Sequence, residues 1–161
     1  MFSLPQLIDE DIRAMDLALG EFMERSGSTA ALIVDQGGFV ITQNGMLENL
    51  DTATLGALAA NSFAATHAMA KLIRETSVSS IYQEGELNSV LISSLAGYGF
   101  LIVVFPAEIG VGSVKYHSYA TIGGIVGQLE KARERAPGAG LDLSDLNLAD
   151  TAAVFQRVSK P

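Results

Sequence analysis

The sequence predicts an α/β domain of the α+β kind, with helices on both faces of a sheet built from hairpins. Segments with the three- and four-residue spacing of amphipathic helices alternate with short apolar runs typical of strands. Their order is helix, two strands, helix, three strands, helix. Because the run 100–105 is continuously apolar, as in strands buried on both faces, we expect helices on both sides of the sheet.

The composition indicates one domain with extra apolar surface. Of the 161 residues, 48% are hydrophobic and 17% are charged, whereas about 25% charged is typical of soluble domains. A chain of this length can bury a core large enough to fold without a cofactor or cross-link. Since charged residues are scarce, we expect a partner to cover part of the surface.

The net charge and the absence of cysteine exclude several classes of function. A net charge of −8 argues against binding to nucleic acid or anionic membranes, which requires clustered Lys and Arg. Without cysteine there are no disulfides, thiolate metal sites or cysteine nucleophiles. The first residues lack a basic segment, and acidic residues at 9–11 interrupt any apolar run. We therefore expect no export signal and a cytoplasmic protein.

Two helices at the ends of the domain follow from periodicity. Apolar residues predict a first helix over 4–25, with Pro5 in its first turn, and a last helix over 112–135 with basic residues near its end. Gly123, Gly124 and Gly127 of the last helix each cost about 1 kcal/mol relative to alanine. We expect these glycines to pack closely against the sheet or another helix.

Turn glycines place the strands in hairpins. The segments 29–35 and 39–42 flank Gln36-Gly37-Gly38, whose glycines supply the positive φ of a tight turn. The segment 77–83 is a weakly patterned third strand, as expected of a sheet edge. The uncharged stretch 88–107 is about long enough to span a membrane, but Gly97-Tyr98-Gly99 divides it into two strand-forming runs. We expect a hairpin there and no membrane insertion.

The helix predicted over 51–74 has no charged side chain from Thr52 to Ala70. Ordinary surface helices carry charge opposite their apolar face. Residues expected to face the sheet are Leu55, Leu58, Ser62, Ala65, Met69 and Leu72 or Ile73. Small or polar residues expected to face outward, as a dimer and partner surface, are Ala57, Ala60, Asn61, Ala64, Ala68 and Lys71.

Small side chains on the outward face would let another helix approach closely, so an antiparallel copy of the same helix could nest there in a two-fold dimer. The alternative is simple helix propensity, because alanine is the best helix former. Propensity alone does not explain why the charges are missing, and we favour an interface.

No motif indicates an active site. The chain lacks a phosphate-binding loop, a dinucleotide fingerprint and a nucleophile elbow. His67 and His117 have no second ligand at metal spacing and are expected in packing or at the surface. Glu84 and Glu86 flank Gly85 in a turn, where solvated carboxylates are expected. We predict no catalytic residue, no metal and no cofactor, and hence a protein that is not an enzyme.

The C-terminal part has its own pattern. We expect a domain over 1–136, and over 137–161 a Pro-Gly linker followed by a tail. Leu148, Phe155 and Val158 would lie on one face of a short helix, which is too short to be stable alone in water. Docking on a partner, packing on its own domain and disorder all remain open for this tail.

The ordered elements resemble the Roadblock domain family (dynein light chain class) and, within it, the bacterial MglB type. No single motif carries this resemblance, but the ordered set is specific and covers roughly 4–135. The carrying segments are 31–40 (ALIVDQGGFV), 50–73, 82–85 (YQEG), 101–105 (LIVVF) and 112–115 (GSVK).

The resemblance implies a three-layer domain with one helix on one face of a five-stranded antiparallel sheet and two on the other. It also implies a homodimer formed through the helix at 51–74 and the third strand, and a partner, a Ras-like small GTPase of the MglA type. Such a regulator would accelerate GTP hydrolysis without inserting an arginine, in bacterial polarity or motility control. No arginine lies on the small-residue face, which agrees with that implication.

Two further functions remain open. One is a Roadblock homodimer that anchors a GTPase or another partner without changing nucleotide turnover. The other is a small-molecule sensor on a similar sheet, for which the sequence shows no converging polar groups.

Overall fold

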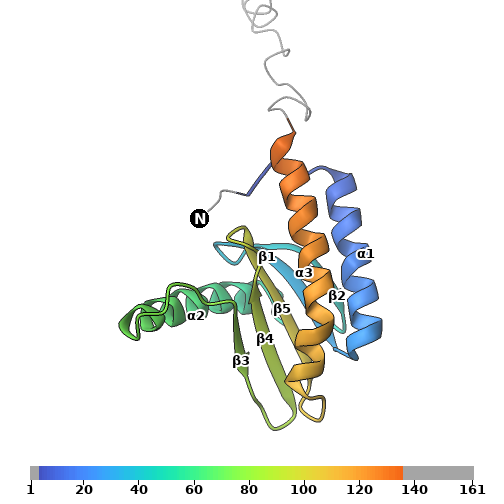
Figure 1. The fold of residues 1–161 in the computed structure, drawn as a ribbon. Coiled ribbons are helices and arrows are strands. Elements are labelled where there is room, and N and C mark those ends of the chain that lie inside the picture. The colour runs from blue at the N-terminus through green and yellow to red at the C-terminus, as the bar shows by residue number, and fades with distance from the viewer. Residues whose placement is uncertain (1–3, 136–161) are drawn as a thin grey trace, which may run out of the picture.

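The computed structural model describes residues 4–135, and every element predicted within these residues is present (Figure 1). The elements in chain order are α1 (Asp9–Ser26), β1 (Ala30–Asp35), β2 (Val40–Gly45), α2 (Thr52–Leu72), β3 (Ser80–Gln83), β4 (Asn88–Ser94), β5 (Gly99–Pro106) and α3 (Val111–Glu134).

The five strands form one antiparallel sheet in the order β2-β1-β5-β4-β3. β5 lies at the centre, and its residues are almost all buried, as the apolar run predicted. β2 and β3 are the two edges. The segment considered for membrane insertion is the β4–β5 hairpin, so the hairpin prediction is confirmed. None of the helices in residues 4–135 is long and apolar enough to cross a membrane.

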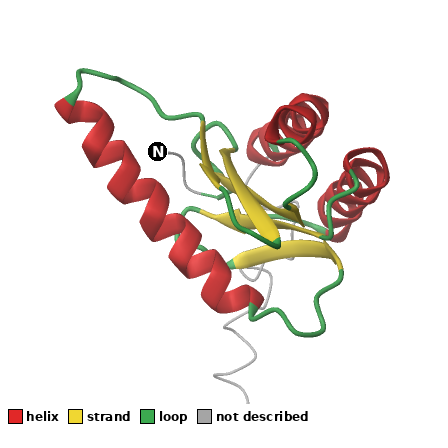
Figure 2. Cartoon of the chain, turned by 90° about the horizontal axis from the view of Figure 1, so that it is seen from below, coloured by secondary structure: helices red, strands yellow, loops and turns green. Residues whose placement is uncertain are grey.

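The sheet is covered unequally on its two faces (Figure 2). Among residues 4–135, α1 and α3 lie side by side on one face, and α2 is the only helix on the other face. This confirms the predicted three-layer arrangement. Because a single helix is narrower than the sheet, residues such as Ile81 and Val90 on the α2 face stay only partly buried.

Each face has its own apolar core. The larger core joins α1 and α3 to the sheet and contains fully buried side chains such as Phe22, Leu101 and Phe105. The smaller core lies under α2, where the rings of Phe63 and Phe100 are 4.6 Å apart between centroids. Most of the folding energy from apolar burial therefore comes from the α1/α3 face.

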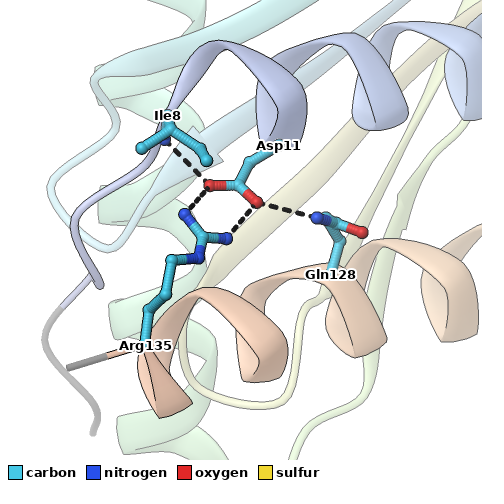
Figure 3. Close-up of polar contacts among 4 residues, drawn as sticks. All are labelled: Ile8, Asp11, Gln128 and Arg135. Atoms are coloured by element: carbon cyan, nitrogen blue, oxygen red, sulfur yellow. Dashed lines mark hydrogen bonds and ion pairs between the residues drawn. The ribbon is translucent and has the colours of Figure 1, made fainter. Parts of the chain in front are cut away.

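An ion pair between a partly exposed arginine and a buried carboxylate ties the start of α1 to the end of α3 (Figure 3). The Asp11 carboxylate has no exposed surface, and it accepts two hydrogen bonds from the guanidinium of Arg135, at 2.9 and 2.6 Å. The Ile8 amide and the Gln128 side chain also donate to it, at 2.8 and 2.7 Å. Arg135, assisted by these two donors, overcomes the effect of burial and lowers the pKa of Asp11 from 3.8 to about 2.

The Asp11 contacts also correct the predicted start of the first helix. α1 begins at Asp9 and not at Leu4, because the Asp11 side chain captures the Ile8 amide and so satisfies one of the free donors at the helix end. Pro5 lies before the helix.

The expectation for the glycines of the last helix is wrong. A Cβ placed on Gly123, Gly124 or Gly127 would meet no atom outside the local helix within 4 Å. These glycines lie toward the open side of α3, and no close contact within residues 4–135 explains them.

We predict that Asp11→Asn lowers the free energy of unfolding by about 2–3 kcal/mol at pH 7. The substitution removes the negative charge of the buried carboxylate, to which Arg135 and the other donors bind. The ionised Asp11 stabilises the fold above its unfolded pKa near 3.8, and this contribution is lost as pH falls through about 2. The difference between wild type and variant should therefore shrink between about pH 4 and pH 2. Urea titrations across this pH range measure it.

Asp9→Asn is the control, because Asp9 is an exposed carboxylate in the same first turn. It should change stability by less than about 1 kcal/mol. Equal effects of the two substitutions would contradict a special role for Asp11.

Candidate partner-binding surface

α2 is the element that carries the predicted site, and its start is defined by a side-chain cap. Asp51 accepts hydrogen bonds from the amide and hydroxyl of Thr54, at 3.0 and 2.6 Å. These bonds hold the pKa of the exposed Asp51 below its ordinary value, the hydroxyl having the larger effect. The carboxylate thus stays ionised at the positive end of the helix, which favours helix formation there.

The face of α2 that packs on the sheet is not the one expected. The buried residues of α2 are Gly56, Ala59, Ala60, Phe63 and Ala70. Apart from Phe63 they are small, and they lie between the two faces that the sequence suggested. α2 therefore packs through a narrow strip of small residues around one aromatic ring.

A contact between two glycines explains this choice of face. A Cβ on Gly56 would lie 2.3 Å from the carbonyl oxygen of Gly38, and a Cβ on Gly38 would lie 2.4 Å from that of Gly56. Gly38 also has φ of +87°, which favours glycine. The β1–β2 turn and the helix backbone meet directly, so α2 can approach the sheet only through its glycine side.

This packing turns the large apolar side chains outward. The expectation that they face the sheet is wrong for Leu58, Met69 and Leu72, which are 58%, 59% and 85% exposed, and for Ile73 at 79%. Leu55 is half-buried, and Ser62 and Ala65 are exposed. We call Leu58, Met69 and Leu72 the large-residue flank of α2.

Most of the residues predicted to face outward do so. Ala57, Asn61, Ala64 and Ala68 are exposed and form what we call the small-residue flank, and Lys71 is exposed at the helix end. Ala60 is the correction, because it is buried against the sheet beside Phe63. The outward surface of α2 thus combines both flanks and carries no charge before Lys71. The large-residue flank was missed as part of this surface because apolar side chains at helical spacing normally indicate the core.

Two features of the surface lie beside α2. Below its C-terminal half is a pocket of about 430 Å³, where the half-buried His67 lies among Phe63, Val78 and Phe100. This agrees with the expected packing role of His67. At the sheet edge, β3 pairs only with β4 among residues 4–135, so one row of its backbone donors and acceptors faces away from the described sheet.

Within residues 4–135, the other residues considered from the sequence do not come together in a catalytic or metal-binding site. Glu84 and Glu86 are exposed in the β3–β4 turn, as expected, and within residues 4–135 no group of three or more His, Cys, Asp or Glu could hold a metal ion. His117 is half-buried on α3. The predicted tail residues Leu148, Phe155 and Val158 lie outside the described residues.

Residues 4–135 thus present an uncharged outward helix surface on α2 and an open strand edge at β3. The chain belongs to the Roadblock/LC7 domain family, whose model matches residues 15–105, from α1 through β5. No match was found among curated protein sequences.

Solved structures of MglB are similar to this chain over nearly their whole length. Myxococcus xanthus MglB is 21% identical with a TM-score of 0.75, over 81% of this chain and 98% of that one. The gliding protein MglB from Thermus thermophilus is 25% identical with a TM-score of 0.74, over 81% and 99%. A structure described as MglB with tetrameric arrangement is 25% identical with a TM-score of 0.75, over 82% and 99%.

The glycine contact between α2 and the β1–β2 turn leads to a prediction about stability. Gly56→Ala should lower the free energy of unfolding by about 2 kcal/mol or more, because the methyl group collides with the Gly38 carbonyl and the backbone must move. Gly124→Ala is the matched change on α3, where the added methyl group meets open space, and it should raise stability by about 0.5–1 kcal/mol. Thermal and urea unfolding measure both. A stabilising Gly56→Ala would contradict the contact.

Proposed function

We propose that this chain forms a homodimer that regulates a Ras-like small GTPase of the MglA type and accelerates its GTP hydrolysis. The observation that carries this proposal is the outward surface of α2, which is uncharged and rich in exposed apolar side chains in a chain with a net charge of −8. Membership of the Roadblock/LC7 family and similarity to MglB support it.

The large-residue flank is the part of α2 best suited to a homodimer. It exposes three large apolar side chains on one helix, Leu58, Met69 and Leu72, whereas exposed apolar residues are usually scattered singly. The partly buried Ile81 and Val90 lie on the same face of the sheet. An antiparallel α2 from a second copy would cover these side chains. Pairing of the two β3 edges would satisfy the open backbone groups in the same two-fold arrangement. One similar structure is described as MglB with tetrameric arrangement, which shows association of a relative.

In this arrangement, the small-residue flank is the binding site for the GTPase. Ala57, Asn61, Ala64 and Ala68 let a partner's backbone approach the helix closely, and Lys71 adds a cation at its end. α2 contains no arginine, and Arg74 lies beyond its C-terminal end with φ of 63°. An arginine supplied in trans contributes about 10³–10⁵ to the rate of such reactions, and this surface has no such donor.

Regulation would therefore act on the partner's conformation. A surface that binds the hydrolysis-competent arrangement of the switch regions more tightly than the others raises the population of that arrangement. The GTPase supplies the reacting groups, and this chain supplies only binding energy. A scaffold that binds without this preference fits the same uncharged surface and is the second candidate.

We predict that the purified protein is a dimer at micromolar concentration and that Leu58→Asp makes it monomeric, because an ionised side chain would be buried without a partner. Leu17→Asp is the control, since Leu17 is 67% exposed on α1, on the other side of the sheet. It should remain dimeric. Analytical ultracentrifugation of the three proteins measures this, and a monomeric wild type would rule out the homodimer.

We predict that the wild-type dimer raises the GTP hydrolysis rate of a purified small GTPase of the MglA type by about tenfold or more, by shifting the population of its conformations. Ala64→Arg should abolish the effect by filling the small-residue flank with a long charged side chain. Ala120→Arg, an equivalent change at an exposed position of α3, should leave it intact. Single-turnover hydrolysis with and without each protein tests this. If the protein binds the GTPase but the hydrolysis rate is unchanged, the scaffold is the remaining function. If it does not bind the GTPase, both functions are ruled out.

A further inference from the structure

Phe39 in the β1–β2 turn is an exposed aromatic residue on a fixed backbone. Its side chain is 76% exposed. The amides of Gly37 and Phe39 both donate to Asp35 Oδ1, at 2.9 Å each, and the Phe39 carbonyl accepts from the Asp35 amide at 2.9 Å. The turn is also pressed against α2 through the Gly38–Gly56 contact. Because the backbone at Phe39 is already fixed, a partner that covers the ring restricts only the side-chain rotamers and need not order the turn.

The ring of Phe39 lies beside a pocket of about 310 Å³ between the turn and the first part of α2. We call it the Phe39 pocket, and it is lined by Gly37, Gly38, Phe39, Val40, Gln43, Thr52, Ala53 and Ala57. Ala57 belongs both to this pocket and to the small-residue flank, so the pocket continues the surface proposed for the GTPase.

The chemistry of the lining defines what the pocket accepts. None of its residues is charged, and its polar side chains are Gln43 and Thr52. The nearby carboxylate oxygen Asp35 Oδ1 is already occupied by two amides. A charged group entering the pocket would lose hydration without gaining a counter-charge, whereas an apolar side chain would bury area against Phe39, Val40 and Ala57.

We propose that the Phe39 pocket receives an apolar side chain of the GTPase and that Phe39 is the anchor that determines affinity for it. This inference rests on the proposed function and extends the binding surface from α2 to the β1–β2 turn. Buried aromatic anchors next to small, rigid surfaces commonly account for a large share of the binding energy of protein interfaces.

Phe39→Ala tests the anchor. The dissociation constant of the GTP-loaded partner, measured by titration calorimetry, should rise about tenfold or more. Phe39→Leu, which keeps an apolar side chain, should raise it only a few-fold. Leu17→Ala removes a comparably exposed apolar side chain from the far side of the sheet and should leave it unchanged. Because Phe39 is exposed, none of these changes should alter the melting temperature by more than a few degrees.

A spectroscopic measurement reports the position of the side chain directly. The chain contains no tryptophan, so Phe39→Trp introduces a single reporter. Its emission should shift to shorter wavelength when the GTPase is added, after the partner's own emission is subtracted. A Leu17→Trp variant should show no shift.

The outcomes separate this inference from the function on which it rests. If wild type and Phe39→Ala bind the GTPase equally, or if the emission of the Phe39→Trp variant is unchanged in the complex, the Phe39 pocket is not part of the interface and the proposed function stands without it. If wild type binds no GTPase, the proposed function fails and the anchor fails with it. Weaker binding of Phe39→Ala together with a blue shift of the Phe39→Trp variant supports the anchor.

Discussion

The direct contact between Gly38 and Gly56 decides how this domain presents its surface. Because neither residue has a side chain, the β1–β2 turn and α2 approach until carbonyl oxygens occupy the space where Cβ atoms would lie. The helix must then turn its glycine and alanine strip toward the sheet, with Phe63 filling the space next to Phe100. Leu58, Met69 and Leu72 are left outside. The apolar surface is therefore a consequence of how closely the backbones pack, and it is not unused core.

The two faces of the sheet differ in how completely they are buried. On one face, α1 and α3 enclose a large apolar core, and the Asp11–Arg135 pair joins their ends through a fully hydrogen-bonded buried carboxylate. On the other, one helix covers the sheet incompletely and leaves Ile81 and Val90 partly buried. Stability resides mainly in the first face, so the second can keep an exposed apolar surface without loss of the fold.

The proposed mechanism follows from three adjoining parts of the α2 side. The large-residue flank suits a second copy, the small-residue flank suits a close backbone approach by a GTPase, and the Phe39 pocket suits one apolar side chain of that partner. Since the flanks share one helix, dimerisation and partner binding would be coupled through the position of α2. A surface of this kind contributes to catalysis only through the conformation it selects in its partner.

The sequence by itself determined the elements and the layers. Period-3.6 and period-2 patterns, the turn glycines and the apolar run 100–105 predicted the helices, the hairpins, a strand buried on both faces and the covered sheet, because those signals arise from local backbone geometry. The missing charges on the helix at 51–74 also predicted a binding surface there, which stays a prediction. Only the tertiary structure decided which side of that helix faces the sheet, why Ala60 is buried, and that Phe39 and Ala57 line one pocket. Helical spacing shows which residues share a face of the helix, but it does not show what packs against that face. The choice depended on a glycine contact between residues 38 and 56, which no local pattern in either segment reveals.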